Sequence, residues 1–458
     1  MKTDTITRVI FHVDVNSAFL SWSALKRLRD EPGSVDLRTI PSAVGGDVKT
    51  RHGIITAKSI PAKAYGVQTG EPVVKALQKC PQLVTVPPDF ETYRASSHSL
   101  MEILLRYTPV LQQMSVDEAF LDLSDRLDPE DRAGALALAA EIRETVSREL
   151  GFTVNVGISS NKLLAKMASD FKKPDRTHTL YPEEVPEKMW PLPIDSLYGC
   201  GKSTAQRLQL IGIHTIGEAA ATEQAVLQSL LGDRSGMHLW RSANGISTSA
   251  VHPEREQAKS VSNERTLSED VDWQNYQTHG IPVIRRLSEK VASRLQKSGL
   301  TGRTVTFQVK TSDFQRYSRQ LVLPEDTDQA GKIEAAALEL ADRLLRAPDG
   351  LFADGAGVRL IGVGVSKLTE KKEQVHQMDL FEWADRQEEE EAQRREQDAA
   401  RRAEEEAERR RAEAAARKKE KQDRLDAMLR QVNSRYGSGT LERGAGKNKE
   451  KDTGENTG

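Results

Sequence analysis

The chain has 458 residues, of which 37% are hydrophobic and 29% charged, and its formal net charge at pH 7 is −2. This length predicts several domains rather than one hydrophobic core. A net charge near zero does not exclude nucleic-acid binding, because such binding depends on local basic faces. The chain lacks an apolar run of the roughly 20 residues that a membrane span needs, and it lacks a signal-peptide pattern. Its two cysteines, Cys80 and Cys200, have no metal-ligand spacing. We therefore expect a cytoplasmic protein with no membrane contact.

Residues 1 to about 190 alternate short apolar segments with amphipathic ones, a pattern typical of an α/β domain. Within this part, the stretch 36–70 is rich in glycine, lysine and small residues and indicates a small inserted subdomain. The predicted strands are 8–15, 83–87, 110–114, 118–123 and 153–158. The predicted helices are 17–30, 72–79, 90–107, 132–150 and 160–170.

Three acidic residues stand in or beside these strands. Asp117 and Glu118 interrupt the alternating apolar run 114–124, which predicts two strands joined by a tight turn, and Asp14 lies in the apolar run 10–15. Burying neighbouring negative charges is costly unless cations neutralise them. Three carboxylates that meet would suit a hard cation such as Mg²⁺, and two such ions are the usual machinery of nucleotidyl transfer. The alternative is that Asp117 and Glu118 only cap a surface turn.

Residues 191–245 are predicted to be helical, with glycine-containing turns at 199–201 and 212–217. Such turns let backbone N–H groups point outward and bind phosphate. A helical hairpin with ordinary glycine C-caps is the alternative. The polar stretch 246–260 lacks apolar periodicity and is interpreted as a linker.

Residues 261 to about 368 are predicted to form a compact α+β module with a four-stranded sheet and two helices. The expected strands are 261–267, 303–312, 316–324 and 358–367, and the expected helices are 281–297 and 331–347. Its many lysines and arginines, with Phe314 and Tyr317, would suit a DNA groove, although each basic residue alone is more simply a solvated charge. The region 384–458 begins with a run of Glu, Arg, Ala and Lys that predicts a long solvated helix, followed by a disordered end.

With this domain order, four motifs make the chain resemble the Y-family DNA polymerases, most closely the bacterial DNA polymerase IV branch, over residues 8–381. They are the acidic run, the segment 156–170 (VGISSNKLLAKMASD), the glycine turns and the peptide 377–381 (QMDLF). The resemblance implies a multidomain α/β and α+β protein shaped as a right hand. The implied parts are a palm at 1–190 with fingers inserted at about 30–80, a thumb at 191–245, a linker at 246–260, a little finger at 261–370, a clamp-binding peptide at 371–383 and a charged helical, then disordered tail at 384–458.

The resemblance also implies roles for the acids. Asp14 and Asp117 would bridge two Mg²⁺ ions, and Glu118 would hold the ion at the primer 3′-OH. The backbone carbonyl of Val15 would complete the site of the nucleotide-side ion. Phe19 would be a steric gate that excludes a ribose 2′-OH, the alternative being a phenylalanine of the core.

Other family motifs imply contacts to nucleotide, DNA and a partner protein. Lys162 would meet the β- and γ-phosphates, whereas Lys166, four residues on along the same helical face, is equally well explained as a surface charge. The implied DNA contacts of the thumb are Gly199, Gly201 and Lys202. The implied contacts to the sliding clamp, the β subunit, are Gln377, Met378, Leu380 and Phe381.

The chain departs from the family pattern in its nucleotide pocket. Asn16 and Ser17 replace an acid and an aromatic residue that are common there, and Ile60 and Lys63 stand where the family usually has Tyr and Arg to hold the triphosphate. Lys63 can supply a point charge without the planar grip of Arg, and Ile60 can donate no hydrogen bond. Lys58 is near enough in sequence to compensate.

These observations predict a template-directed DNA polymerase of the translesion kind, with low fidelity and no proofreading. It would bind primer–template DNA, dNTPs and the sliding clamp, and act as a monomer. The altered Ile60 and Lys63 pair keeps a second hypothesis open, a non-catalytic clamp-bound adaptor with the same shape. A nucleotide cyclase, another palm-fold enzyme, is disfavoured by the predicted thumb, little finger and clamp peptide.

Overall fold

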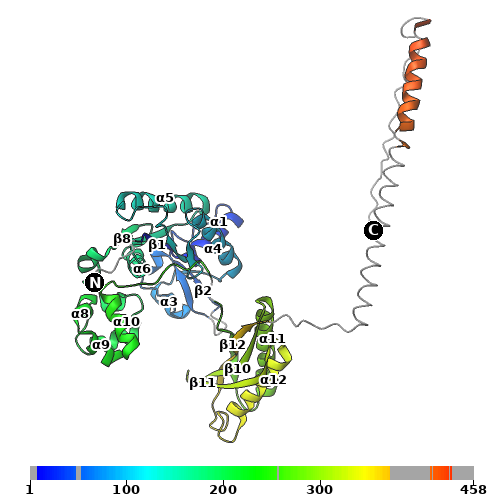
Figure 1. Ribbon diagram of the computed structural model, residues 1–458. Helices are drawn as coiled ribbons and strands as arrows, with labels where there is room; N and C mark the ends of the chain where they lie inside the picture. Colours follow the sequence, from blue (N-terminus) through cyan, green and yellow to red (C-terminus); the bar gives the residue numbers. More distant parts are fainter. Residues whose placement is uncertain are drawn as a thin grey trace, which may run out of the picture. The chain divides into compact units, whose positions relative to one another are not determined.

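A computed structural model describes residues 8–47, 53–254, 257–371, 413–414, 416–432 and 434–435 (Figure 1). The chain divides into two units, residues 1–371 and 372–458. In the second unit, residues 416–432 are helical and expose Leu425 and Met428. The predicted clamp peptide 377–381 and the end of the tail lie outside the described residues. No helix in the described ranges is long and apolar enough to cross a membrane.

The first 180 residues are built on a five-stranded sheet with the order β5-β6-β1-β7-β8. The strands are β1 (Ile10–Val15), β5 (Leu111–Gln113), β6 (Glu118–Asp122), β7 (Val154–Ser159) and β8 (Thr177–Thr179). The helices of this part are α1 (Ala18–Asp30), α4 (Phe90–Leu105), α5 (Arg132–Leu150) and α6 (Lys162–Asp170). The predictions for these elements are confirmed except for β8, whose polar Thr-His-Thr sequence gives no strand signal.

The alternation of β1 decides which side chains reach each face of this sheet. Phe11, Val13 and Val15 enter the main core, where they join residues of α1, α4 and α5, and Figure 1 shows these helices grouped beside β1. Ile10 packs on the other face with Phe120 of β6 and Ala165 of α6. His12 and Asp14 share the parity of Ile10, so the sheet presents both to the face that α6 covers.

The inserted subdomain has its own three-stranded sheet with the order β3-β2-β4. Its strands are β2 (Ser42–Gly45), β3 (Ile55–Lys58) and β4 (Val84–Val86), and its helices are α2 (Ile60–Ala64) and α3 (Val73–Lys79). The predicted strand 83–87 is therefore confirmed as β4. Strands β2 and β3 carry no strand signal in the sequence, because each has four residues that are mostly small or polar. Ser59 begins α2 as its N-cap and accepts a hydrogen bond from the backbone of Ala62 at 3.0 Å.

Residues 182–243 are mostly helical and share one core. This confirms the prediction of a helical region at 191–245, whereas the short helical segments at 182–189 lie outside the predicted range. Their elements are η1 (Pro182–Glu184), η2 (Val185–Met189), η3 (Ile194–Ser196), α7 (Lys202–Gln209), α8 (Ile216–Ala221), α9 (Gln224–Leu231) and α10 (Asp233–Ala243). Thr215 and Glu218 form a capping box at the start of α8.

Residues 260–370 form the predicted α+β module, a four-stranded antiparallel sheet with the order β11-β10-β12-β9 and two long helices packed on one core. The elements are β9 (Ser260–Val271), η4 (Tyr276–Gly280), α11 (Ile281–Lys297), β10 (Leu300–Thr311), β11 (Arg316–Thr327), α12 (Ala330–Ala341), η5 (Asp342–Arg346) and β12 (Val358–Glu370). Phe314 and Tyr317, at the turn into β11, are exposed.

Helix α6 packs on the sheet through a close contact at Gly157 of β7. A Cβ atom at this position would overlap the carbonyl oxygen of Ala165 and come within 2.5 Å of the backbone nitrogen of Ser169. Gly157 pairs with His12 in the register of β1 and β7. The missing side chain therefore lets α6 lie directly over the part of β1 that carries His12 and Asp14.

Replacing Gly157 with alanine should therefore lower the free energy of unfolding by about 1–3 kcal/mol, the usual result of overpacking. Urea unfolding of the full chain measures this loss. Gly331→Ala is the matched control, because a Cβ there meets no atom within 4 Å and alanine favours the helix. Equal stability of Gly157→Ala and wild type would contradict the tight contact.

Candidate active site

The three predicted acids meet at one end of the five-stranded sheet. Asp14 on β1 lies opposite Glu118 on β6 in the antiparallel register. Asp117 precedes β6, and its carbonyl oxygen accepts a hydrogen bond from the backbone of Val15 at 2.9 Å. The Ser115 hydroxyl donates to the Asp117 carboxylate at 2.5 Å. The strand pairing of residues about a hundred positions apart therefore builds the acidic site.

The two neighbouring acids have opposite shifts of pKa. Burial raises the pKa of Asp117, and the carboxylates of Asp14 and Glu118 add to the increase. The contact with His12 lowers the pKa of Glu118 to about 2, and Lys166 contributes to the decrease. Among the described residues, Asp14 and Glu118 have ion-pair partners, whereas none is found for Asp117. The site is therefore short of positive charge at Asp117.

Two lysines from α6 and the loop after it neutralise the other two acids. Lys166 Nζ lies 2.8 Å from Glu118 Oε2 and 3.2 Å from Asp14 Oδ2, and its side chain is only 12% exposed. Lys173 Nζ lies 2.9 Å from Asp14 Oδ1 and 2.9 Å from Asp170 Oδ1. The surface interpretation of Lys166 is therefore wrong. Because α6 turns its Lys166 face onto β1, this ammonium enters the acidic site.

His12 is a part of the site that the sequence analysis missed. It is fully buried, and its Nδ1 lies 2.8 Å from the hydroxyl of Ser169. The same hydroxyl donates to the carbonyl of Lys166 at 2.8 Å. Nε2 faces Glu118 Oε2 at 3.3 Å. Burial lowers the pKa of His12. The sequence signal for His12 was that it is a polar residue two positions before Asp14, so that both side chains point to the same face of the strand.

Two carboxylates and a histidine of the site have ligand atoms close enough to share one cation, and Asp117 is not among them. His12, Asp14 and Glu118 each offer one ligand atom, and these atoms lie within 4.8 Å of one another. The carboxylates are partly buried, and Asp117 is held where burial and like charges oppose its ionisation. A divalent cation would relieve that opposition, and carboxylate oxygens are the ligands that Mg²⁺ prefers.

A cavity of about 670 Å³ begins at this acidic end and extends to the inserted subdomain. Val15, Phe19 and Asp117 line it from one side, and Lys58, Ile60 and Lys63 line it from the other. This volume is in the range of pockets for small-molecule ligands. The structure thus brings Asp117, Val15, Phe19 and Lys63 to one cavity, as the sequence analysis expected of a nucleotide pocket.

The position of Phe19 fits both the gate and the core interpretation, because its side chain lines the cavity and also packs on the core. Its ring stacks on Tyr93 with centroids 4.5 Å apart and planes at 12°, and it meets Phe90 edge to face. Trp22 supports the same cluster. The flat ring is therefore held in a fixed orientation at the cavity wall.

Lys162 does not line this cavity. Its ammonium donates to Gln112 Oε1 at 2.7 Å and to the carbonyl of Ala250 at 3.4 Å, and it lies 4.9 Å from the ring centroid of Phe120. The lysine that does line the cavity is Lys173. The contact between Lys162 and nucleotide phosphates stays a prediction.

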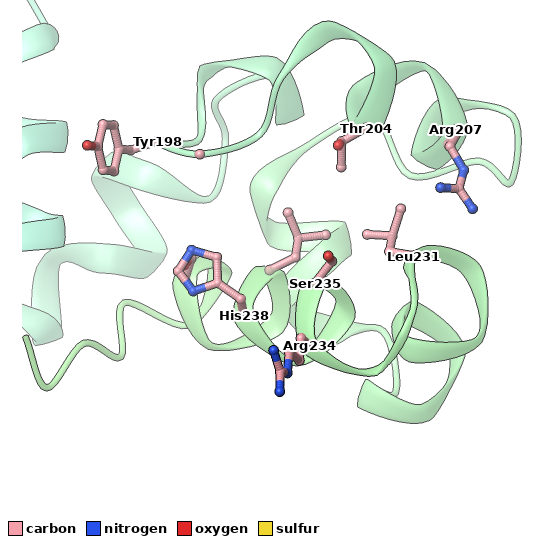
Figure 2. Close-up of a pocket in the computed structure, with 10 residues that line it drawn as sticks. Tyr198, Thr204, Arg207, Leu231, Arg234, Ser235 and His238 are labelled. Atoms are coloured by element: carbon pink, nitrogen blue, oxygen red, sulfur yellow. The ribbon is translucent and has the colours of Figure 1, made fainter. Parts of the chain in front are cut away.

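The glycine turn of the helical part precedes α7. Gly199 adopts φ +90°, which favours glycine, and Lys202 begins α7. A second cavity of about 410 Å³ lies beside this turn, and Figure 2 shows Thr204 of α7 and Ser235 of α10 projecting toward the space between these helices. Arg207 and Arg234 also line it. The DNA contacts of Gly199, Gly201 and Lys202 stay predictions.

Comparison with known proteins places the chain in a family. The model of the impB/mucB/samB family matches residues 13–170, that of the IMS family HHH motif matches 182–213, and that of the impB/mucB/samB family C-terminal domain matches 258–380. The chain is 42% identical to the DNA polymerase IV of Clostridium acetobutylicum over 366 residues, which cover 79% of this chain and 88% of that protein. It is 36% identical to DNA polymerase IV 1 of Bacillus subtilis over 391 residues, 84% of this chain and 88% of that protein.

A solved structure shows the same fold. It is the Y-family DNA polymerase chimera Dbh-Dpo4(243-245)-Dbh, with a TM-score of 0.66 and 23% identity, covering 78% of this chain and 98% of the chimera. The sequence matches and this shared architecture agree with the acidic site on β1 and β6. The chain therefore belongs to the impB/mucB/samB family of the Y-family DNA polymerases.

Proposed function

We propose that this polymerase adds dNTPs to a primer 3′-OH under template direction, with release of pyrophosphate, by two-metal-ion nucleotidyl transfer. The observation that carries the proposal is the convergence of Asp14, Asp117 and Glu118 beside a cavity that contains Phe19. The family membership supports a translesion polymerase, for which we expect low fidelity and no proofreading.

The acids would hold two Mg²⁺ ions. Asp14 and Asp117 would bridge them, Glu118 would hold the ion at the primer 3′-OH, and the Val15 carbonyl would complete the site of the other ion. Bound ions of this kind lower the pKa of the attacking hydroxyl and stabilise charge on the transferred phosphate. In this structure Lys166 forms ion pairs with Asp14 and Glu118, and Lys173 forms one with Asp14, so cations orient these two carboxylates.

The cavity would hold the incoming nucleotide. The ring of Phe19, fixed by its stack on Tyr93, would lie under the sugar and leave no room for a 2′-OH. Lys63 and Lys173 line the same cavity and would meet phosphate oxygens.

We propose four further properties that accompany this function. They are the DNA contacts of the thumb, the binding of the sliding clamp through Gln377, Met378, Leu380 and Phe381, a monomeric state and a cytoplasmic location. The non-catalytic adaptor is not favoured, because the curated relatives are named as DNA polymerases and all three acids converge in the structure.

Asp117→Asn should reduce primer extension with Mg²⁺ and dNTPs by about 10³-fold or more, because several kcal/mol of metal-derived stabilisation are lost. Affinity for primer–template DNA should be unchanged. Glu130→Gln, a neutralised exposed acid of the same domain, is the control and should extend normally. Extension by Asp117→Asn at the wild-type rate would refute the two-ion assignment.

The same variant should be more stable than wild type at pH 7 in EDTA. The folded state raises the pKa of Asp117 above its ordinary value, so the charged carboxylate opposes folding at neutral pH, and an uncharged amide removes that opposition. The difference should shrink as the pH falls below the ordinary pKa of an aspartate, about 3.9, where the carboxyl is protonated in both states. Thermal unfolding at several pH values measures it, and a less stable variant at pH 7 would be contrary to the expected sign.

Phe19→Ala should admit ribonucleotides and lower the ratio of dNTP to NTP incorporation efficiency by about tenfold or more, the effect of roughly 1.4 kcal/mol. Phe90→Ala is the control, since Phe90 contacts Phe19 but does not line the cavity. Phe19→Leu, which keeps an apolar contact with Tyr93, separates the gate from a loss of packing. An unchanged ratio in both Phe19 variants would exclude the gate.

A further inference from the structure

The inserted subdomain presents two lysines to the cavity without acidic partners. Lys58, the last residue of β3, and Lys63, on α2, both line it. Among the described residues, no carboxylate forms an ion pair with either one. The other lining cations are neutralised, since Arg38 pairs with Asp36 at 2.8 Å and Lys173 pairs with Asp14 and Asp170.

Lys58 is held in this position by the fold of the subdomain. It pairs with Ala43 in the register of β2 and β3, and the next residue, Ser59, is the buried N-cap of α2 that also donates to the carbonyl of Ile40. The backbone of Lys58 is thus fixed between a strand pair and a capped helix. Its side chain is half-buried rather than free in solvent.

The electrostatics of Lys58 favour an anion. Burial lowers the pKa of Lys58, and the positive charge of Lys63 lowers it further. Glu71, the nearby acid, is already in contact with Lys79 at 2.5 Å. Two ammonium groups that face one cavity and repel each other would be stabilised by a ligand with several negative charges. The same cavity is also lined by Phe19 and by the acid Asp117.

Ile60 cannot make a polar contact with a bound phosphate, which leaves that role to the two lysines. It stands three residues before Lys63 on α2, is 57% exposed and lines the cavity, yet its side chain can donate no hydrogen bond. The subdomain therefore offers phosphate oxygens two point charges in place of a planar guanidinium and a hydroxyl.

We propose that Lys58 is a triphosphate-binding residue of this polymerase and, together with Lys63, holds the β- and γ-phosphates of the incoming dNTP. The inference rests on the proposed function, because it takes the cavity as the dNTP pocket. Its consequence is that nucleotide affinity depends on charge from β3 as well as from α2.

The test compares Lys58→Met, Lys58→Arg and Lys75→Met in the full chain. Lys75 is an exposed lysine of α3 in the same subdomain and does not line the cavity. The dissociation constant of a dNTP is measured on the complex with a dideoxy-terminated primer–template, and the inhibition constant of pyrophosphate is measured beside it. Thermal unfolding and DNA affinity of each variant report on a merely structural effect.

Lys58→Met should weaken both dNTP and pyrophosphate about 10- to 100-fold, the range for a lost hydrogen bond to a charged group. The KM for dNTP should rise in parallel with little change in kcat, while Lys58→Arg and Lys75→Met stay close to wild type. Unchanged dNTP affinity in Lys58→Met, or a loss explained by a lower melting temperature, would overturn the role of Lys58 while the polymerase assignment stands. Failure of the wild type itself to bind or incorporate a dNTP would instead overturn the proposed function.

Discussion

The site depends on the balance of charge between three carboxylates and the cations that α6 and its following loop bring to them. Burial, together with the nearby charges of Asp14 and Glu118, raises the pKa of Asp117, and Lys166 and Lys173 form ion pairs with the other two acids. A buried acidic cluster is tolerated only when such partners are present. The packing of α6 on β1 and β7 is therefore as much a part of the site as the acids themselves.

That packing depends on small details of the sheet. Gly157 has no side chain where α6 crosses β7, and the hydroxyl of Ser169 on α6 links His12 on β1 to the backbone of Lys166. These contacts orient His12 toward Glu118 and Lys166 toward both acids. Because successive side chains of a strand point to opposite faces of the sheet, the core residues of β1 lie on one face and the residues of the site lie on the other.

The cavity joins two parts of the chain with different tasks. The five-stranded sheet and α1 supply Asp117, just before β6, and the ring of Phe19, whereas the inserted subdomain supplies lysines without acidic partners. Lysines without acidic partners would suit a ligand that carries phosphate charge. The proposed role of Lys58 and Lys63 would place positive charge where the family commonly has tyrosine and arginine.

The amino-acid sequence by itself indicated the family and most of the strands and helices, and it predicted the order of the domains and the three acids. These follow from local patterns, such as apolar alternation and adjacent carboxylates, that are visible in a short window. The strands β2, β3 and β8 escaped prediction because they are short and weakly apolar. The roles of His12, Lys166 and Lys173, and the lack of acidic partners for Lys58, were decided only by the tertiary structure. Lys166 meets Asp14 from 152 positions away, and whether a lysine is paired or solvated depends on which elements pack against it, which no local pattern records.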